Sequence, residues 1–562
     1  MNKLPLGIYT FEKIRHGGFL YIDKTKYIHE LTQHTDPILL TRPKRFGKTL
    51  LLSTIKSIFA GRKKLFKGLW LYDQQCEWEP YPIIHLDMAK VNCKTPENFA
   101  QTLTAVLTKK IKAANLQVRG QTPAEIFHSF IVDLELAHRR KVVVLIDEYD
   151  LPIIGNVTHP DNLPAIWEQL VALYGVPLAA KDSLRFVFYA GVCRFDPQAL
   201  FPGQDALRDI TFDPAYAPIC GLTVEEFDLR FPPYLEVVLS ALETEGICPG
   251  KPGQDRLRAD LLDWYGGYSW DGKTKLINLF RLLQFFRAKE LNNFWQTPKT
   301  PPFLVNLAKK HDLVKRLTDG ELSLDQAENV IDPADVAPLP ALSQTGYLSV
   351  SRTSRRKGGI VHKLDMPNLS ARWSLLIHCM AKEYNLKPGQ LWGEMDQILK
   401  SLKNQNARVT ALAFKRLLAS LKHAKSEGTP SEHYGRIFSY LALTLGHTFP
   451  APEGHGARET VDCLMKTGDG AYLAIGMSHH RLPVPVPGPG NRDDEPGEEE
   501  WRYPSEEILA LEERLSGPAM AYLGRIEGSG RVRRLREGGF AVTPAALVVH
   551  GDSVVKAVYG KG

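Results

Sequence analysis

The stretch RPKRFGKT, residues 42–49, decides how the N-terminal part of the chain folds. An apolar, β-rich run at 38–41 precedes it, and a helical stretch from Lys48 to about Ala60 follows and ends at Gly61. A strand, a glycine-containing loop and a helix form the context in which Gly-x-x-x-x-Gly-Lys-Thr loops bind nucleotide phosphates. We therefore predict a phosphate-binding loop at residues 42–49.

The residue types in this loop fit ATP and Mg²⁺. Backbone N–H groups around Gly47 and the helix N-terminus supply an anion site. Lys48 is predicted to reach the β and γ phosphates, and the Thr49 hydroxyl to hold Mg²⁺. Arg42 and Arg45 flank the phosphates and are expected to contact them. Arg42 stands where the strict pattern has its first glycine, so the loop alone is also compatible with an ordinary basic loop before a helix.

Two further strands carry the other residues expected at such a site. The apolar run 142–146 ends in Asp147 and Glu148. Asp147 is predicted to hold Mg²⁺ and Glu148 to act as the general base that polarises the attacking water. The run 186–190 leads to Arg194, a candidate sensor of the γ-phosphate, although a surface arginine fits this position almost equally well. An acid pair at a strand end is common, but two elements in the expected order favour the catalytic interpretation.

The pattern of the remaining chain predicts three domains. Buried apolar strands that alternate with helices indicate a parallel sheet covered on both faces, here a P-loop ATPase domain at 1–225. Residues 226–425 read as a mostly helical middle region with a polar, basic loop at 351–359. Residues 426–562 change character: a helix from Glu432 to Leu445 precedes a hairpin, and a strand lies at 545–550. The segment 483–500 is rich in Pro, Gly and acids and is expected to be a flexible loop.

Composition narrows the class of protein. The 562 residues are 44% hydrophobic and 24% charged, an ordinary globular balance, and no run has the roughly 20 apolar residues of a membrane span. The first residues lack the pattern of a secretory signal. Seven scattered cysteines without zinc spacing fit a reducing, cytoplasmic setting. The net charge of +7 is compatible with nucleic acid but does not by itself argue for it.

Seven motifs together resemble the bacterial AAA-ATPase-like proteins that carry a C-terminal nuclease-like domain. They are LPLGIYTFEKIRHGGFLYIDKT at 4–25, RPKRFGKTLLLST at 42–54, VLIDEYD at 144–150, AGVCRF at 190–195, DITFDPAYAPICGLTVEEF at 209–227, WYGGYSWDG at 264–272 and QTGYLS at 344–349. The resemblance covers most of the chain. It implies that the loop without its first glycine is normal for the family, and that Tyr21, Asp23 and Lys24 pack beside the nucleotide site. It also implies a helical lid or winged-helix-like middle region.

The same resemblance implies a PD-(D/E)XK nuclease fold at the C-terminus. Such nucleases need a carboxylate on one strand and Glu-x-Lys on its hairpin partner, which bind Mg²⁺ and activate water. Glu432 and Asp462 match the family, but Gly476 and Ser478 stand where the glutamate and lysine belong. We therefore expect a degenerate site without nuclease activity. Three nearby residues are candidates for compensation, but ordinary surface positions explain them better: Glu459, His479 and His480.

Three functions remain open at the level of the sequence. In the first, ATP hydrolysis controls a degenerate nuclease-like domain that binds DNA, RNA or a partner protein. In the second, the chain is a slow-turnover, nucleotide-dependent scaffold for signalling or antiphage defence, either with a partner or as a homo-oligomer. In the third, it is an ATP-regulated DNA nuclease, which the glycine and serine in the hairpin argue against. Turnover number separates the first two hypotheses.

Overall fold

The computed structural model describes the chain in two compact units. The described residues are 1–203, 205–244, 253–289, 300–319, 322–356, 359–421, 430–445, 463–466, 472–479, 510, 513–537, 541–550 and 554–560. Unit 1 comprises Met1–Phe294 and Ser323–Ala371, and unit 2 comprises Trp295–Leu322 and Arg372–Gly562. The domain boundaries near 225 and 425 stay predictions, and the segment 483–500 lies outside the described residues.

A five-stranded, fully parallel sheet forms the centre of unit 1. Its order is β2 (Ile83–Asp87), β3 (Val142–Asp147), β4 (Leu184–Gly191), β1 (Ile38–Thr41) and β5 (Arg208–Asp209). All residues of β1 and β3 are buried, which is why their sequences read as continuous apolar runs. The predicted parallel sheet is confirmed. Because its strands are parallel, the predicted phosphate-binding loop after β1 and the acids at the end of β3 lie at the same edge of the sheet.

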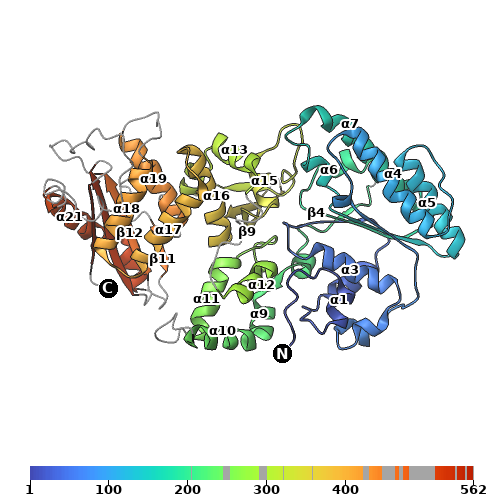
Figure 1. Ribbon diagram of the computed structural model, residues 1–562, viewed down its shortest axis with the longest axis horizontal. Helices are drawn as coiled ribbons and strands as arrows, with labels where there is room; N and C mark the ends of the chain where they lie inside the picture. The colour runs from blue at the N-terminus through green and yellow to red at the C-terminus, as the bar shows by residue number, and fades with distance from the viewer. Residues whose placement is uncertain are drawn as a thin grey trace. The chain divides into compact units, whose positions relative to one another are not determined.

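Helices cover both faces of this sheet (Figure 1). One face packs against α1 (Phe11–His16), α2 (Thr25–Thr32) and α3 (Lys48–Phe59), with Ile38, Leu40, Val143, Leu145, Phe186 and Phe188 in the shared core. The other face is covered by α4 (Pro96–Ala113), α5 (Pro123–His138) and α7 (Leu163–Ala179). Thr122 and Glu125 form a capping box that starts α5. Two single-turn helices, α6 (Leu151–Ile154) and α8 (Pro197–Leu200), follow β3 and β4.

A helical cluster follows the sheet in unit 1. It consists of α9 (Val224–Arg230), α10 (Pro232–Thr244), α11 (Gln254–Tyr265) and α12 (Leu279–Ala288), and the two-residue strands β6 (Leu222–Thr223) and β7 (Leu276–Ile277) pair beside it. The chain from 224 to 244 forms two helices and not one, because Pro232 has no backbone N–H to donate to the preceding turn, so α9 ends before it and α10 begins with it. Leu276 and Ile277 form β7, and α12 begins directly after them, where the Asn278 side chain caps it.

Within the basic segment at 351–359, residues 351–356 belong to a strand, where the sequence predicts a loop. In the structure β9 (Ser349–Arg356) pairs antiparallel with β10 (Gly359–Asp365), and β10 pairs with β8 (Ser323–Asp325). The last five residues of β9 are exposed or only partly covered polar side chains, so the apolar alternation that signals a strand is missing. The middle region is therefore not only helical. The helix α15 (Pro338–Gln344) leads into this sheet.

Unit 2 combines a helical layer with a four-stranded mixed sheet. The helices are α13 (Pro302–Lys310), α14 (Leu313–Asp319), α16 (Leu369–Glu383), α17 (Pro388–Lys403), α18 (Ala407–Leu421) and α19 (Pro430–Leu445). The sheet order is β11 (Cys463–Lys466), β12 (Tyr472–His479), β13 (Val542–His550) and β14 (Val554–Tyr559), with β12 and β13 parallel and the outer pairs antiparallel. The predicted hairpin and final strand are confirmed, and β14 extends the sheet beyond them.

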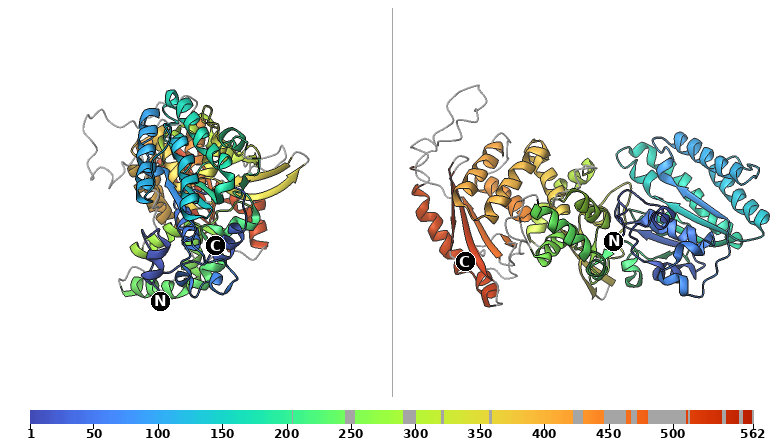
Figure 2. Two further views of the ribbon diagram at one scale, coloured as in Figure 1. Left: turned by 90° about the vertical axis from the view of Figure 1, so that its right-hand side faces the viewer. Right: turned by 60° about the horizontal axis from the view of Figure 1, so that its bottom comes forward.

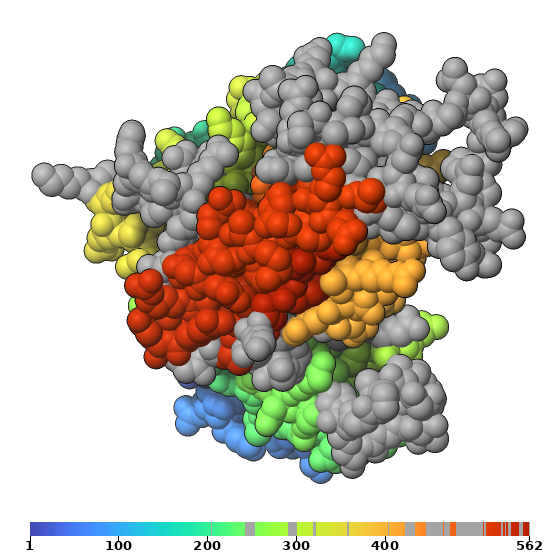
Figure 3. Space-filling view, turned by 90° about the vertical axis from the view of Figure 1, so that its left-hand side faces the viewer, coloured from blue at the N-terminus to red at the C-terminus, as the bar shows by residue number. Residues whose placement is uncertain are grey.

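The two faces of this second sheet are covered by different parts of unit 2. On one face α21 (Ser516–Glu527) and α22 (Gly530–Glu537) lie against β13, with Leu523, Ile526 and Val532 in the core. The described residues near the C-terminus, in red, form a continuous surface in Figure 3. On the other face α18 lies against β14, where the hydroxyls of Thr410 and Tyr559 are 2.9 Å apart. Within the described residues, no helix is both long enough and apolar enough to cross a membrane.

Candidate nucleotide site

The loop between β1 and α3 has the backbone of an anion-binding turn. Arg45 and Gly47 have φ angles of 68° and 99°, in the left-handed region that favours glycine. A Cβ built on Gly47 meets no atom within 4 Å, so glycine is needed there for its φ angle and not for lack of space. The Arg45 guanidinium lies 4.3 Å from the ring centre of Phe280. The loop therefore presents backbone N–H groups on its open side, at the N-terminus of α3.

Lys48 lies folded against this loop. Its side chain is almost completely buried, and Nζ donates to the carbonyl oxygens of Arg42, at 3.0 Å, and Pro43, at 3.4 Å. An ammonium group held by neutral carbonyls gains a stronger, charged acceptor when a phosphate enters the loop. The position of Lys48 therefore fits a phosphate ligand.

Thr49 and Asp147 meet between α3 and the end of β3. Thr49 Oγ1 donates to Asp147 Oδ2 at 2.8 Å. Burial raises the pKa of Asp147 to about 6, although the Thr49 hydrogen bond and the Lys48 charge oppose this shift. A hydroxyl and a carboxylate at this distance are the oxygen ligands that Mg²⁺ takes beside nucleotide phosphates. Both residues fit a magnesium ion, whose charge would favour the ionised carboxylate.

Glu148 differs from its neighbour in exposure and backbone. It is half-buried where Asp147 is buried, and its φ angle is 54°, which is uncommon for a residue with a side chain. Its N–H donates to Asp147 Oδ1 at 3.1 Å. The turn thus leaves the Asp147 side chain buried and the Glu148 side chain partly exposed to solvent. This arrangement suits a metal ligand followed by a solvent-accessible base.

Asp150 and Tyr149 join the end of β3 to the end of β4. The completely buried Asp150 accepts the N–H groups of Val192, at 2.9 Å, and Cys193, at 2.7 Å. The Tyr149 hydroxyl donates to the Cys193 carbonyl at 2.7 Å. Burial and the Glu148 charge raise the pKa of Asp150 to about 6. The sequence did not predict these roles of Tyr149 and Asp150. Nothing in the sequence indicates where the side chain of an acid that follows the general base points.

Arg194 is held in an ion pair. Its Nε donates to Asp209 Oδ2 at 2.5 Å, and Nη1 donates to the Asn329 carbonyl at 3.3 Å. Its backbone N–H donates to Gln344 Oε1 at 2.7 Å, and its carbonyl accepts the N–H of Ile331 at 2.8 Å. The guanidinium is thus bonded within the fold, and a role as γ-phosphate sensor requires that it leave Asp209.

Arg42 is also bonded within the fold. It is 1% exposed, and its Nη1 donates to the carbonyls of Thr41, at 2.9 Å, and Thr211, at 2.8 Å. The guanidinium carbon lies 4.2 Å from the ring centre of Trp270. Burial lowers the pKa of Arg42 to about 10. These contacts give Arg42 a structural place and do not support the predicted phosphate contact.

Phe46 fixes the loop from its inner side. Its ring packs edge-on against Tyr268, at 4.8 Å, and Trp270, at 5.3 Å, and its carbonyl accepts the N–H of Gly221 at 3.0 Å. A Cβ on Gly346 would lie 3.0 Å from Pro43, so this second glycine is needed for a close approach to the loop. The motifs around 264–272 and 344–349 therefore support the phosphate-binding loop. Phe46, an aromatic residue in an otherwise polar loop, is the feature of the sequence that could have predicted this packing.

The N-terminal segment packs on α3 and on the helical cluster. The hydroxyls of Tyr21 and Thr54 are 3.2 Å apart, which places Tyr21 beside α3. The buried Lys24 forms an ion pair with Glu226 at 2.6 Å, at the start of α9. Asp23 accepts hydrogen bonds from the backbone N–H and hydroxyl of Thr25. The segment thus links the sheet domain to the helices that follow it.

Only part of the predicted degenerate nuclease site lies within the described residues. Gly476 is buried in β12 opposite Ala546, and Ser478 is half-buried opposite Val548, so both point to the same side of the strand. The backbone of Glu432 lies in α19, and His479 ends β12. The other residues named for this site, Glu459, Asp462 and His480, lie outside the described residues. Among the described residues, no group of three His, Cys, Asp or Glu is suited to a metal ion.

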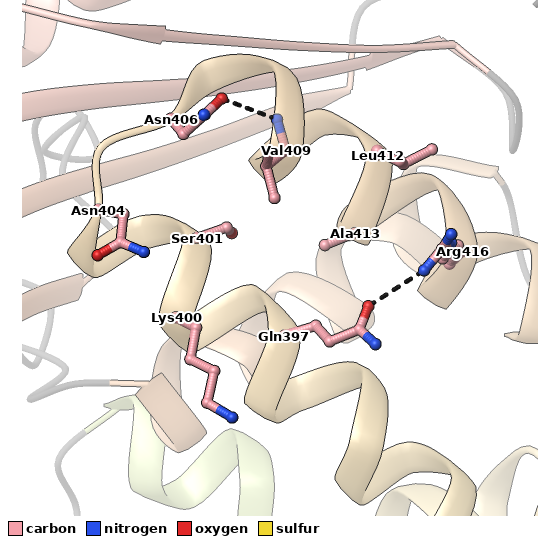
Figure 4. Close-up of a pocket in the computed structure, with 9 residues that line it drawn as sticks. All are labelled: Gln397, Lys400, Ser401, Asn404, Asn406, Val409, Leu412, Ala413 and Arg416. Carbon is pink, nitrogen blue, oxygen red and sulfur yellow. Dashed lines mark hydrogen bonds between the residues drawn. The ribbon is translucent and has the colours of Figure 1, made fainter. Parts of the chain in front are cut away.

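A separate cavity of about 270 Å³ lies between α17 and α18 in unit 2 (Figure 4). Arg416 donates to Gln397 across it at 3.3 Å, and Lys400 is paired with Asp396 on the same helix. Ser401 donates to a carbonyl of its own helix. The described lining thus offers polar contacts but no nucleophile paired with a base.

The parallel sheet and the arrangement of Lys48, Thr49 and Asp147 are consistent with a P-loop-like N-terminal domain. Comparison with known proteins agrees: residues 5–201 match the family model described as predicted AAA-ATPase. A protein of Azotobacter chroococcum mcd 1, described as an uncharacterized protein in the vnfD 5' region, is 29% identical over 462 residues, which are 81% of this chain and 86% of that protein. The similarity of residues 5–201 to AAA-ATPases indicates nucleotide binding and suggests ATPase activity.

Proposed function

We propose that this protein binds and hydrolyses ATP with Mg²⁺, and that its nucleotide state controls a degenerate nuclease-like domain that binds nucleic acid or a partner. The observation that carries the proposal is the 2.8 Å contact between Thr49 and Asp147 beside the buried Lys48. Three residues from two elements converge at the sheet edge where the loop opens. That set of groups is what Mg²⁺ and nucleotide phosphates require.

The residues divide the work of the site. Lys48 and the backbone of the loop hold the phosphates, while Thr49 and Asp147 hold the metal. Glu148 accepts the proton of the attacking water as general base. Bound Mg²⁺ neutralises charge on the phosphates during transfer. Asp150 keeps the turn after β3 in register with the end of β4 through its two backbone hydrogen bonds.

The hydrogen bonds of Arg194 support the proposal that the nucleotide state controls the rest of the chain. They run from the end of β4 to Asn329 and Gln344, in the segment that precedes the crossing of the chain into unit 2 at Arg372. A shift of β4 on nucleotide binding would move this segment first. At the C-terminus, Gly476 provides no ligand and Ser478 no positive charge, which supports a binding role without cleavage.

The first test is a pair of substitutions at the nucleotide site. Lys48→Ala removes the charge that faces the phosphates and is expected to abolish ATP binding, measured by isothermal titration, with an unchanged circular dichroism spectrum. Lys44→Ala is the matched control, because Lys44 is exposed in the same loop and is expected to leave ATP affinity unchanged. Unchanged affinity in Lys48→Ala would overturn the assignment.

The second substitution separates binding from chemistry. Glu148→Gln removes the base and spares the metal ligand, so ATP affinity is expected to stay within about twofold while hydrolysis slows by about 100-fold or more. Phosphate release measured in steady state reports the rate. Equal turnover in the wild type and the variant would assign the base to another residue.

A slow-turnover scaffold is the second candidate function. The ion pair between Arg194 and Asp209 favours it, because the one arginine predicted to sense the γ-phosphate is held within the fold. In this case ATP binding controls assembly and hydrolysis resets it. Hydrolysis that stays slow with added DNA and RNA, together with ATP-dependent assembly in light scattering, would favour the scaffold over a nucleic-acid-stimulated ATPase.

A further inference from the structure

The hairpin of β9 and β10 carries an unbalanced positive face. Arg352, Arg355, Arg356 and Lys363 are all exposed. In the register of the hairpin Lys363 lies directly opposite Arg352, and Gly359 lies opposite Arg356. Directly paired residues point to the same face of an antiparallel sheet, so Arg352, Arg356 and Lys363 share one face. Within the described part of the chain, none of these three forms an ion pair.

The repulsion between the like charges of Arg352 and Lys363 destabilises the hairpin in the isolated protein. Two cations directly opposite each other on a strand pair destabilise it. Of the acids in the sheet, Asp365 pairs with Ser349. Asp325 lies across from Val361, on the same face as the three cations, where its carboxylate accepts the N–H of Ala327 at 2.9 Å. Three cations against one acid leave this face with a positive excess. An anion on this face would remove the repulsion. The arrangement therefore favours an anionic partner.

The opposite face of the hairpin holds it to unit 1. Thr353 donates to the Asp271 carbonyl at 3.0 Å, and its hydroxyl lies 3.1 Å from His362 Nδ1. The buried His362 ring packs against Phe212 at 5.1 Å. One face is thus fixed by contacts within the unit, which leaves the face with three cations toward solvent.

The outer part of the hairpin is a two-stranded ribbon. The third strand β8 pairs only with residues 361–363 of β10, and just beyond it the N–H of Gln326 donates to the Ile360 carbonyl at 2.8 Å, so 355–356 and 359 have no further strand beside them. The ribbon projects from the rest of its unit (Figure 2, left view, yellow). A two-stranded β-ribbon is one of the two elements that the major groove of B-DNA, about 12 Å wide, admits.

We propose that the β9–β10 hairpin is a duplex-DNA contact, in which Arg352, Arg356 and Lys363 bind backbone phosphates while the ribbon lies in the major groove. Ser354 lies on the same face as the three cations, and its hydroxyl donates to the Val361 carbonyl at 3.4 Å, a long contact that it would exchange for a phosphate oxygen. The contact is independent of sequence, because the charges face the backbone. It lies in unit 1 and does not depend on the proposed role of the C-terminal domain or on ATP hydrolysis.

The test measures binding of the full-length chain to a fluorescent 20-base-pair duplex by anisotropy, between 50 and 200 mM salt. Replacing Arg352, Arg356 and Lys363 together by Gln is expected to weaken binding at least tenfold. The slope of log affinity against log salt should fall by roughly 2 to 3, since each phosphate contact contributes about 0.9. Affinity and slope equal to those of the wild type would overturn the proposal, as would a wild-type chain that does not bind the duplex.

Two control variants distinguish the effect of the hairpin residues on DNA binding from the effect of the protein's net charge. Replacing three other exposed lysines of unit 1, Lys64, Lys109 and Lys112, by Gln removes the same charge and is expected to change affinity less than threefold. The variant Arg352→Lys with Arg356→Lys keeps the charge and is expected to bind within about threefold of the wild type. If the three distant lysine substitutions weakened DNA binding as much as the three hairpin substitutions, only the net charge of the protein would matter. That result would overturn the proposed site.

A competition experiment tests the choice of duplex DNA. An RNA duplex of equal length has a deep, narrow major groove that the ribbon cannot enter, so it should compete at least fivefold less well than the DNA duplex. Equal competition would overturn the groove contact. The variant Lys48→Ala is expected to bind DNA like the wild type, so failure of the ATP proposal and failure of this one give different results.

Discussion

At the scale of single residues, Phe46 joins the predicted phosphate-binding loop to the core of unit 1. It is 2% exposed, and its ring touches Tyr268 and Trp270 from the segment after α11. We expect Phe46→Ala to lower the free energy of unfolding by about 3–5 kcal/mol, the range for buried Phe→Ala changes, and to weaken ATP binding as well. Chemical denaturation and isothermal titration measure the two effects.

A second buried phenylalanine of the same core is the control for Phe46. Phe66 is fully buried and packs against Phe11 and Trp78, not against the loop. Phe66→Ala is expected to cost similar stability while ATP affinity at a temperature well below unfolding stays unchanged. Equal loss of ATP affinity in both variants would mean that the loop responds to general stability and not to Phe46.

The buried Asp150 makes stability depend on pH. Its pKa of about 6 in the folded protein lies above the usual value of 3.8, so the folded state holds the proton more tightly than the unfolded state. This contribution to stability is complete below about pH 4 and is lost as the pH rises through 6. Between pH 4.5 and 8 the wild type should therefore lose roughly 2 kcal/mol more than Asp150→Asn.

Denaturation in urea at the two pH values, without Mg²⁺, measures this difference between the proteins. Other titrating groups, including Asp147, are common to both and cancel in the comparison. The amide oxygen of asparagine can still accept the N–H groups of Val192 and Cys193. Parallel pH profiles for the two proteins would show that Asp150 keeps an ordinary pKa in the folded state.

At the scale of elements, Gln344 at the end of α15 ties the middle of the chain to β4. Its Oε1 accepts the N–H of Arg194, and its Nε2 donates to Asn329 at 2.9 and 3.0 Å. Gln344→Leu leaves the Arg194 N–H without its acceptor, at a cost of about 1–3 kcal/mol. We expect faster hydrogen exchange at the amides of Arg194 and Ile331. The amides inside β1 and β3 serve as the internal control, and uniform acceleration there as well would indicate global destabilisation.

Some elements follow from the sequence, and others do not, for physical reasons. The strands β1, β3 and β4 are buried on both faces, so their apolar runs predict them, and the loop before α3 is fixed by its glycine and lysine. The strand β9 stays hidden because its polar residues face solvent. At the site, Thr49 and Asp147 follow from motif spacing, whereas the places of Arg42 and Arg194 depend on carbonyls and acids far away in the sequence.

At the scale of the whole molecule, the chain is expected to bind DNA without cutting it. Phosphodiester hydrolysis needs metal ligands and a water-activating group within reach of one another, and β12 offers Gly476 and Ser478 at the positions concerned. Linear and single-stranded DNA incubated with the protein, ATP and Mg²⁺ or Mn²⁺ should remain intact on gels. Cleavage that disappears in Asp462→Ala would contradict this prediction, and cleavage that persists would point to another site or a contaminant.

The ion pair between Lys24 and Glu226 has a consequence for the time course of synthesis. The two residues are 202 positions apart, so the amine leaves the ribosome long before its carboxylate partner is made. At roughly 5–20 residues per second the interval is about 10–40 seconds. During this time a lysine that is buried in the finished protein stays hydrated, and the N-terminal segment cannot close on α9. The N-terminal segment therefore reaches its final packing only after the first helix of the cluster has emerged, well beyond residue 201.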